Sequence, residues 1–337
     1  MTVDVKAIDR TKRALQELCA GSGPIIVGPW LSEIGFEVLY WVPWLRWAIQ
    51  FAGLNPHDLT IVSRGGPRSW YQGIGAHYVD VLDFYTPEEL CAGGKRRVDE
   101  QVARAAAMGL KHALRSAKQH MLTAFDKDVI ANVSASQGLA APRVLHPSLM
   151  YAFFRPFWKR ATPTLYRTST VVRRLTPPAL DVDLPASYVA MKFYSSNALP
   201  DTPEHRQMVQ GIVSAQVQHS DVVLLHSGTQ YDDHGEVPIE PHPRVHRVAL
   251  PPDQNLDIQT AVIARSSGYV GTYGGFAYLA PFLGVQTLAI YGQDNFRKDH
   301  REVMAAVANT NLRVPFSVEP IRHGLSLSPK KRARHAA

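Results

Sequence analysis

The sequence predicts an α/β protein with two doubly wound, Rossmann-like β/α domains that face a central cleft. Short, mainly apolar segments alternate with helical patterns in both halves of the chain, as strands of a parallel sheet do in β/α domains. A proline-rich stretch at 176–186 shows neither a helical nor a strand period, which predicts a linker. The length of 337 residues suits two domains. The expected division is an N-terminal β/α domain at 1–175, the linker, a C-terminal β/α domain at 187–320 and a disordered basic tail at 321–337.

Composition narrows the class of protein. Hydrophobic residues make up 45% and charged residues 19%, which is ordinary for a globular protein with a sizeable core. Cys19 and Cys91 form no Cys-x-x-Cys pattern, which indicates a reducing compartment and neither a disulfide framework nor structural zinc. The N-terminus lacks a signal-peptide hydrophobic region, and no run of about 18 apolar residues occurs. We therefore expect a cytoplasmic protein.

The positive charge suggests an acidic partner. The net charge is +7 and the pI is about 9.4, which suits a nucleotide, a nucleic acid or an anionic membrane. Part of the charge lies at Lys330–Arg334, where two roles stay open: a solubilising tail, and peripheral contact with an anionic membrane. Basic residues are not interleaved with aromatic residues over any long stretch, so we expect no nucleic-acid partner.

In the first half, strands and helices alternate. Apolar spacing predicts a helix over 7–20 that stops at Gly21. The remaining predictions are buried strands at Pro24–Gly28, Leu59–Ser63 and Val79–Phe84, and helices at about 98–124 and 146–160.

The loop after the first strand leads into an aromatic helix and carries two candidate bases. Glu33 and Glu37 lie four residues apart, so they share a face if both are helical. A carboxylate in an apolar aromatic setting at the end of a parallel strand suits a general base, because desolvation raises its pKa. The alternative is that both are first-turn charges favoured by the helix dipole.

The second half repeats the alternation. The predicted strands are Tyr188–Tyr194, Asp221–His226 and Val245–Leu250, and the predicted helices are 203–219, about 255–266 and about 299–309. Pro203 is expected in the first turn of its helix, directly after Thr202.

The strongest motif is Gly268–Gly292, which predicts a strand, a glycine turn, a short helix, a glycine stop and a strand. The turn Thr272-Tyr273-Gly274-Gly275 lets backbone approach a ligand and lies where the free N–H groups of a helix begin, which suits a phosphate. We expect Gly284 to end the helix in the left-handed conformation, and Pro281 to kink or shorten it. A glycine-bounded βαβ connection without a ligand is the alternative.

Further candidate residues lie in or directly after predicted strands, where ligands bind open α/β sheets. Arg64 precedes two glycines and suits an anion contact, with a plain turn as the alternative. Lys192 is an unusual residue inside an apolar strand. His226 and Ser227 end a strand, and either a nucleotide contact or a simple turn explains them.

The segment Tyr269–Gly292 resembles the donor-site segment of GT-B glycosyltransferases, most closely the heptosyltransferase-like members. The shared pattern is a glycine turn, a short helix with Leu-Ala, then Leu-Gly, a strand and Tyr-Gly. The loop Gly28–Gly35 is similar to the glycine loop that carries the catalytic residue near the acceptor in that fold. Thr272-Tyr273-Gly274 and Tyr278 stand where the heptosyltransferase pattern has Asp-Thr-Gly and a His, so the sugar and the stereochemistry do not carry over.

The resemblance implies a metal-independent glycosyltransferase that moves a sugar from a nucleotide-activated donor to a hydroxyl of a glycan, lipid-linked or small-molecule acceptor. It implies Glu33 as the general base, Glu37 as its substitute, and Lys192 as a stabiliser of the leaving phosphate. The implied donor-binding residues are Arg64, Ser195, His226, Ser227, Thr272, Tyr273, Gly274 and Gly275, and the acceptor-side residues are Trp30, Ser32 and Gly35. The alternatives are a non-catalytic sugar- or nucleotide-binding protein of the same fold, and a nucleotide-sugar epimerase.

Other motifs are weak. Asp181-Val-Asp183 matches the Asp-x-Asp metal motif of one glycosyltransferase class, but it lies in the predicted linker rather than at a strand end. His242 and His246 lack the spacing of metal ligands. The absence of a Walker A sequence, a clean Gly-x-Gly-x-x-Gly and a Gly-x-Ser-x-Gly argues against kinases, dehydrogenases and serine hydrolases. We expect no metal, and no cofactor beyond a nucleotide-sugar co-substrate.

Overall fold

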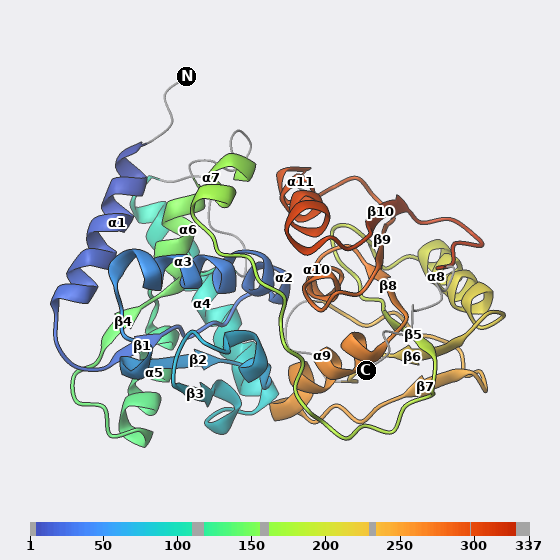
Figure 1. Ribbon diagram of the computed structural model, residues 1–337, viewed down its shortest axis with the longest axis horizontal. Coiled ribbons are helices and arrows are strands. Elements are labelled where there is room, and N and C mark those ends of the chain that lie inside the picture. The colour runs from blue at the N-terminus through green and yellow to red at the C-terminus, as the bar shows by residue number, and fades with distance from the viewer. Residues whose placement is uncertain (1–4, 110–117, 156–161, 229–233, 297, 328–337) are drawn as a thin grey trace. The chain divides into compact units, whose positions relative to one another are not determined.

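The computed structural model describes residues 5–109, 118–155, 162–228, 234–296 and 298–327. The chain forms two compact units, one built mainly from residues up to Val172 and the other mainly from Arg173 onward. Each unit has its own parallel sheet between helices (Figure 1). The predicted α/β class with two Rossmann-like β/α domains is confirmed.

The first unit contains a four-stranded sheet. Its elements are α1 (Val5–Ala20), β1 (Ile25–Val27), α2 (Ile34–Phe36), the π-helical segment η1 (Glu37–Trp41), α3 (Val42–Ala52), β2 (Leu59–Ser63), β3 (His77–Asp80), α4 (Pro87–Ala107), α5 (Ala124–Ser136), β4 (Arg143–Leu145), α6 (Pro147–Phe154) and α7 (Thr162–Thr168), with short 3-10 turns at Pro56–Asp58, Pro67–Tyr71 and Val81–Asp83.

The strand order β3-β2-β1-β4 places the first strand inside the sheet, with Ile26 beside Thr60 on one side and Val144 on the other. Ile26, Val62 and Val79 pack with Phe125 and Val129, so α4 and α5 cover one face. Ile25 and Val27 alternate to the other face, on the side where α1, α3 and α6 lie against one another (Figure 1).

The second unit contains a six-stranded sheet. Its elements are β5 (Tyr188–Lys192), α8 (Pro203–Gln216), β6 (Asp221–Leu224), β7 (Val245–Arg247), α9 (Asn255–Arg265), β8 (Gly268–Thr272), α10 (Gly275–Phe282), β9 (Thr287–Tyr291), α11 (Lys298–Ala306), the π-helical segment η7 (Val307–Leu312) and β10 (Phe316–Pro320).

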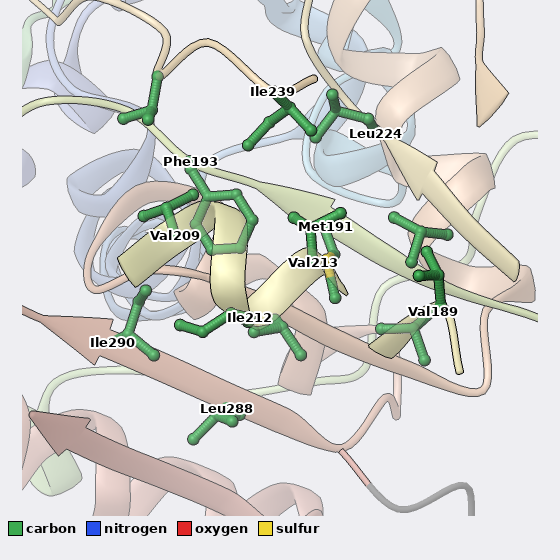
Figure 2. Close-up of a cluster of buried hydrophobic side chains, with 14 of the residues drawn as sticks. Val189, Met191, Phe193, Val209, Ile212, Val213, Leu224, Ile239, Leu288 and Ile290 are labelled. Atoms are coloured by element: carbon green, nitrogen blue, oxygen red, sulfur yellow. The ribbon is translucent and has the colours of Figure 1, made fainter. Parts of the chain in front are cut away.

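The order β10-β9-β8-β5-β6-β7 is the Rossmann order 6-5-4-1-2-3 when β5 is counted as the first strand. One face packs against α8, where Val189, Met191 and Leu288 meet Ile212 and Val213 (Figure 2). The opposite face carries α10, which contacts β8, β9 and α9. Successive residues of β5 and β8 therefore point alternately toward α8 and toward α10.

Several predicted boundaries are wrong. The helix predicted at about 98–124 overlaps only the end of α4, which begins at Pro87 after the capping residue Thr86 and ends at Ala107, while α5 begins only at Ala124. Residues 110–117 of the prediction lie outside the described residues. The strand predicted to reach Phe84 ends at Asp80, where a 3-10 turn starts. The short strands β4 and β10 were not predicted, and β6 and β7 end earlier than expected.

Local signals at two helix ends are confirmed. Thr202 accepts a hydrogen bond from the His205 N–H, and Pro203 lies in the first turn of α8. Gly284 has φ +79° at the end of α10, which stops one residue after Pro281.

Parts of the predicted linker and tail contact the second unit. The Leu175 N–H donates to the Phe282 carbonyl, and Arg265 donates to the Val182 carbonyl. Ile321, Leu325 and Leu327 pack against the core beside α8, so the predicted start of a disordered tail at 321 is wrong. The basic cluster Lys330–Arg334 lies outside the described residues. None of the helices within the described ranges is long and apolar enough to cross a bilayer.

Candidate functional site

The strand order places the predicted loops at the points where ligands bind open α/β sheets. Such sites lie outside the carboxyl ends of strands, where the strand order reverses. In the first unit the reversal lies between β1 and β4, and the loop Gly28–Glu33 follows β1. In the second it lies between β5 and β8, which are followed by Phe193–Asn197 and by the turn Thr272–Gly275.

The loop Gly28–Glu33 is held tightly against β2. Gly28 has φ +124°, and a Cβ there would lie 2.4 Å from the Val62 carbonyl oxygen, so the chain passes this close only as glycine. The Trp30 N–H donates to the same carbonyl at 2.9 Å. The Leu31 N–H donates to the Gln119 side chain at 2.8 Å.

The three predicted acceptor-side residues are buried. The fully buried ring of Trp30 stacks on Trp41 and Tyr151, with centroids 5.7 and 6.2 Å apart. Ser32 Oγ lies 3.2 Å from the Tyr151 hydroxyl, and Gly35 lies within α2. In this structure the three residues hold the loop in place.

Glu33 is the more exposed of the two candidate bases. It precedes α2 with extended backbone, at φ −65° and ψ 138°, so the condition under which the two glutamates would share a helical face is not met. Its side chain is 33% exposed, and its carboxylate lies 3.7 Å from the Lys118 ammonium.

Glu37 is fully buried and starts the π-helical segment η1. Its Oε1 accepts from the hydroxyls of Ser63 and Tyr71, each at 2.5 Å, and its Oε2 has no partner in the described part of the chain. Burial raises the pKa of Glu37 to about 7, although Arg64 and the two hydroxyls oppose the shift. The raised pKa expected in this aromatic setting is therefore found at Glu37.

The N–H groups of the turn after β2 are already occupied. The carboxylate of Asp80 accepts from Gly65 N–H at 3.0 Å and from Gly66 N–H at 2.7 Å. It also accepts from Leu82 N–H and from the Tyr78 hydroxyl, each at 2.9 Å. We call such a turn carboxylate-capped. The Arg64 side chain donates to the Ser32 carbonyl, so it supports the loop Gly28–Glu33.

Positively charged side chains gather around this loop, in a group that we call the cationic cluster: Arg64, Arg97, Lys118 and Arg155. Arg97 is 1% exposed and donates to the Leu31 carbonyl at 3.1 Å. The Lys118 ammonium lies 4.3 Å from the centre of the Phe36 ring. Burial, and then the charges of Arg155, Lys118 and Arg97, lower the pKa of His120 to about 3. The imidazole is therefore neutral among positive charges.

In the second unit, Lys192 is 8% exposed at the end of β5. Its ammonium donates to the Leu225 carbonyl and lies 3.3 Å from the Glu236 carboxylate. It also lies 5.0 Å from the centre of the Phe276 ring, in the first turn of α10. The predicted phosphate-stabilising lysine is thus paired within the protein while its charge stays next to α10.

The turn after β6 is a second carboxylate-capped turn. The Glu236 carboxylate accepts from Ser227 N–H at 2.8 Å and from Gly228 N–H at 3.0 Å. Although burial opposes it, Lys192 and these bonds hold the pKa of Glu236 below its usual value. Burial lowers the pKa of His226 to about 4, and its Nε2 faces the Phe193 N–H at 3.4 Å, so it is a neutral acceptor.

Ser195 and Thr272 use their hydroxyls within the protein. Ser195 Oγ accepts from Gly235 N–H at 3.0 Å. Thr272 Oγ1 accepts from Tyr194 N–H and donates to the Tyr194 carbonyl, both at 3.0 Å. Thr272 therefore fixes the position of Tyr194.

The turn before α10 has no such cap. The N–H groups of Gly274, Gly275 and Phe276 donate to no group within the described residues, and the first bond of the helix runs from Ala277 N–H to Gly274 O at 2.8 Å. Gly274 has φ +115° and Gly275 has φ +31°; a Cβ on them would lie 3.2 and 2.9 Å from the Tyr194 hydroxyl. We call this segment the uncapped turn.

Tyr273 packs beside the uncapped turn. Its ring is 6% exposed and lies 4.4 Å from Phe296 and 5.5 Å from Tyr278, centre to centre. Burial raises its pKa to about 12, so the phenol is neutral.

Sequence reasoning missed the residues that decide which turns are open. Asp80 caps a turn whose Gly66 lies 14 residues before it, and Glu236 caps a turn whose Gly228 lies 8 residues before it. Neither contact can be predicted from a local sequence pattern. Tyr194 and Arg97 were also missed, although Tyr194 lies only two residues after the predicted lysine Lys192. Among the described residues, no group of three or more His, Cys, Asp or Glu side chains is placed to hold a metal.

Comparison with known proteins finds only distant likeness. No protein-family model matches the sequence, and a search of curated proteins finds no match either.

Several solved structures match at low similarity. Heptosyltransferase WaaC of E. coli with ADP has a TM-score of 0.35 and 12% identity, over 88% of this chain and 93% of that one. The iron-containing dodecameric glycosyltransferase TibC of enterotoxigenic E. coli has a TM-score of 0.35 and 11% identity over 80% of this chain, which spans 58% of its length. A putative UDP-N-acetylglucosamine 2-epimerase of Listeria monocytogenes has a TM-score of 0.33 and 12% identity, over 85% and 82%. Matches at this level do not assign the chain to either class of enzyme.

Proposed function

We propose that this protein is a glycosyltransferase with a nucleotide-activated sugar as its donor, and that its second unit binds the donor phosphate at the uncapped turn. The observation that carries the proposal is that the N–H groups of Gly274, Gly275 and Phe276 donate to no group in the described part of the chain and lie where the strand order of the sheet reverses. Such groups at the start of a helix attract anions. The sequence resemblance of Tyr269–Gly292 to a GT-B donor-site segment supports the same role.

Lys192 adds positive charge to this site. Its ammonium lies over Phe276, the third residue of the uncapped turn, while Glu236 holds it in place. As the sugar leaves, negative charge develops on the phosphate, and the N–H groups and Lys192 stabilise it. The hydroxyls of Ser195 and Thr272 act indirectly, because they hold the backbone around Tyr194 and Gly235.

Glu33 is the proposed general base. It removes the proton of the acceptor hydroxyl while the acceptor oxygen bonds to the sugar and the sugar–phosphate bond breaks. Its side chain is 33% exposed, whereas Glu37 is fully buried under Ser63 and Tyr71. We therefore assign Glu37 a role in holding the buried side of the loop, rather than in contacting the acceptor.

The cationic cluster favours an acceptor that carries phosphate or carboxylate. Arg97 and Arg64 donate to the carbonyls of Leu31 and Ser32, so positive charge surrounds the loop that ends in Glu33. A negatively charged acceptor would be attracted to this edge of the sheet.

A binding experiment tests the donor site. Isothermal titration with ADP, UDP, GDP, CDP and CMP should give saturable binding by at least one of them. Gly275→Ala should weaken that binding about tenfold or more, because the new Cβ meets the Tyr194 hydroxyl and shifts the N–H groups. Gly324→Ala is the matched control, since Gly324 also has positive φ, in open space. Lack of binding by all five nucleotides would contradict the proposal.

A turnover experiment tests the enzyme class. Glu33→Gln should abolish sugar transfer and leave nucleotide affinity unchanged. Binding without turnover by the unaltered protein would favour a non-catalytic binding protein, and conversion of the donor without an acceptor would favour an epimerase.

A further inference from the structure

A buried phenol on β8 lacks a hydrogen-bond partner. Tyr269 is fully buried, and its hydroxyl bonds to no group within the described residues. A buried hydroxyl normally finds a partner, because losing water without one costs free energy. Tyr188, on the neighbouring strand, shows the usual arrangement: its hydroxyl donates to the Val262 carbonyl at 2.7 Å.

The phenol lies over Gly271, three residues before the uncapped turn begins. A Cβ on Gly271 would lie 2.5 Å from the Tyr269 hydroxyl and 2.9 Å from its Cζ. The ring therefore runs along β8 over Gly271, toward the carboxyl end of the strand. β8 ends one residue later at Thr272, and the uncapped turn follows. Glycine at 271 is what leaves room for the ring.

Other groups of the site lie on the same side. Val270 and Met191 face α8, so Tyr269, Gly271 and Lys192 face α10. Lys192 reaches the Phe276 ring on that side. Burial, and then the neighbouring Tyr194, hold the pKa of Tyr269 well above its usual range, so its hydroxyl stays protonated and can donate.

We infer that Tyr269 is a further ligand-binding residue, whose hydroxyl donates to an oxygen of the anion held at the uncapped turn. The inference rests on the proposed donor site. A bound phosphate oxygen supplies the partner that the free protein lacks, and the N–H groups of Gly274 and Gly275 hold that oxygen from the other side.

Tyr269→Phe tests the inference because the change has opposite effects on the two states. In the free protein it removes an unsatisfied buried hydroxyl, so the melting temperature should stay the same or rise. In the complex it removes a donor to a charged oxygen, so the dissociation constant for the tightest binder among ADP, UDP, GDP, CDP and CMP should rise about tenfold.

Tyr188→Phe is the matched control. It removes a satisfied phenol on the same face of the same sheet, so the melting temperature should fall while the dissociation constant stays unchanged. Equal affinity of Tyr269→Phe and the unaltered protein would overturn this inference and leave the proposed function standing. Absence of nucleotide binding by the unaltered protein would overturn both.

Discussion

The glycine turns after β2 and β6 differ from the turn after β8 in what satisfies their N–H groups. Asp80 accepts from Gly65 and Gly66, and Glu236 accepts from Ser227 and Gly228. At Gly274–Phe276 no protein group within the described residues accepts. A glycine turn at a strand end therefore does not by itself indicate a ligand site. N–H groups that lack a protein acceptor are the better indication of a ligand site, because buried or half-buried N–H groups are nearly always paired.

The difference separates two uses of the same local structure. In the capped turns a carboxylate occupies the place of an anion and ties two segments together, so these turns stabilise the fold. In the uncapped turn no carboxylate of the described residues takes this position, and we propose that a phosphate of the ligand does. Mutations should therefore cost stability at the capped turns and affinity at the uncapped one.

The largest stability loss is expected from Asp80→Ala. The change removes the acceptor of the Gly65, Gly66 and Leu82 N–H groups and of the Tyr78 hydroxyl. The loss should lower the free energy of unfolding by about 4 kcal/mol. Urea denaturation measures it. Asp83→Ala is the control, because Asp83 accepts only a 3.3 Å bond from the Asp80 N–H and should cost about 1 kcal/mol or less. Equal losses would break the distinction between capped and uncapped turns.

Glu37, which bonds to Ser63 just before the first capped turn, should make the free energy of unfolding depend on pH. Its pKa is about 7 in the folded protein, against 4.5 for an ordinary glutamate, so the folded state binds more protons between these values. The Glu37 contribution is therefore fully present below pH 4.5 and is lost as pH rises to 7, by about 3 kcal/mol.

Glu37→Gln should remove this dependence. Unfolding free energies measured at pH 5 and pH 8 should differ less in the variant than in the unaltered protein. If the two proteins show the same difference, Glu37 is not a buried acid in solution.

A smaller loss is expected from Glu236→Gln. Ser227 N–H and Gly228 N–H donate to different oxygens of Glu236, so the amide leaves one of them without its acceptor. It also loses the charge that faces Lys192, so stability should fall by about 1–2 kcal/mol. Nucleotide affinity should change less than in Gly275→Ala. A larger affinity loss in Glu236→Gln would make the second capped turn part of the ligand site.

The sequence predicted those elements whose cause is local. β2 is a five-residue segment with three apolar residues that ends at Ser63, and α1 ends before Gly21. The apolar pattern located the strand and the glycine located the end of the helix. β4 and β10 escaped because they are short edge strands with polar residues such as Arg143 and Glu319. Thr86 and Glu89 form a capping box that marks the start of α4 and was overlooked.

The candidate site was predictable only in part, because only some of its features have a local cause in the sequence. The glycine turn of Gly274 and Gly275 is a local feature and was found. Its openness depends on the absence of a carboxylate like Asp80 or Glu236, and those contacts arise only when distant segments meet in the folded chain. The buried hydrogen bonds of Glu37 likewise depend on Tyr71 and Ser63, which come from other elements.

Amide chemical shifts test the central claim most directly. The ¹⁵N-labelled protein is titrated with the nucleotide that binds it most tightly, and the signals of glycines in the three turns are followed. The account predicts large, saturable shifts at Gly274, Gly275 and Phe276, and small ones at Gly65, Gly66 and Gly228. Large shifts at the capped glycines without a response at Gly274–Phe276 would contradict it.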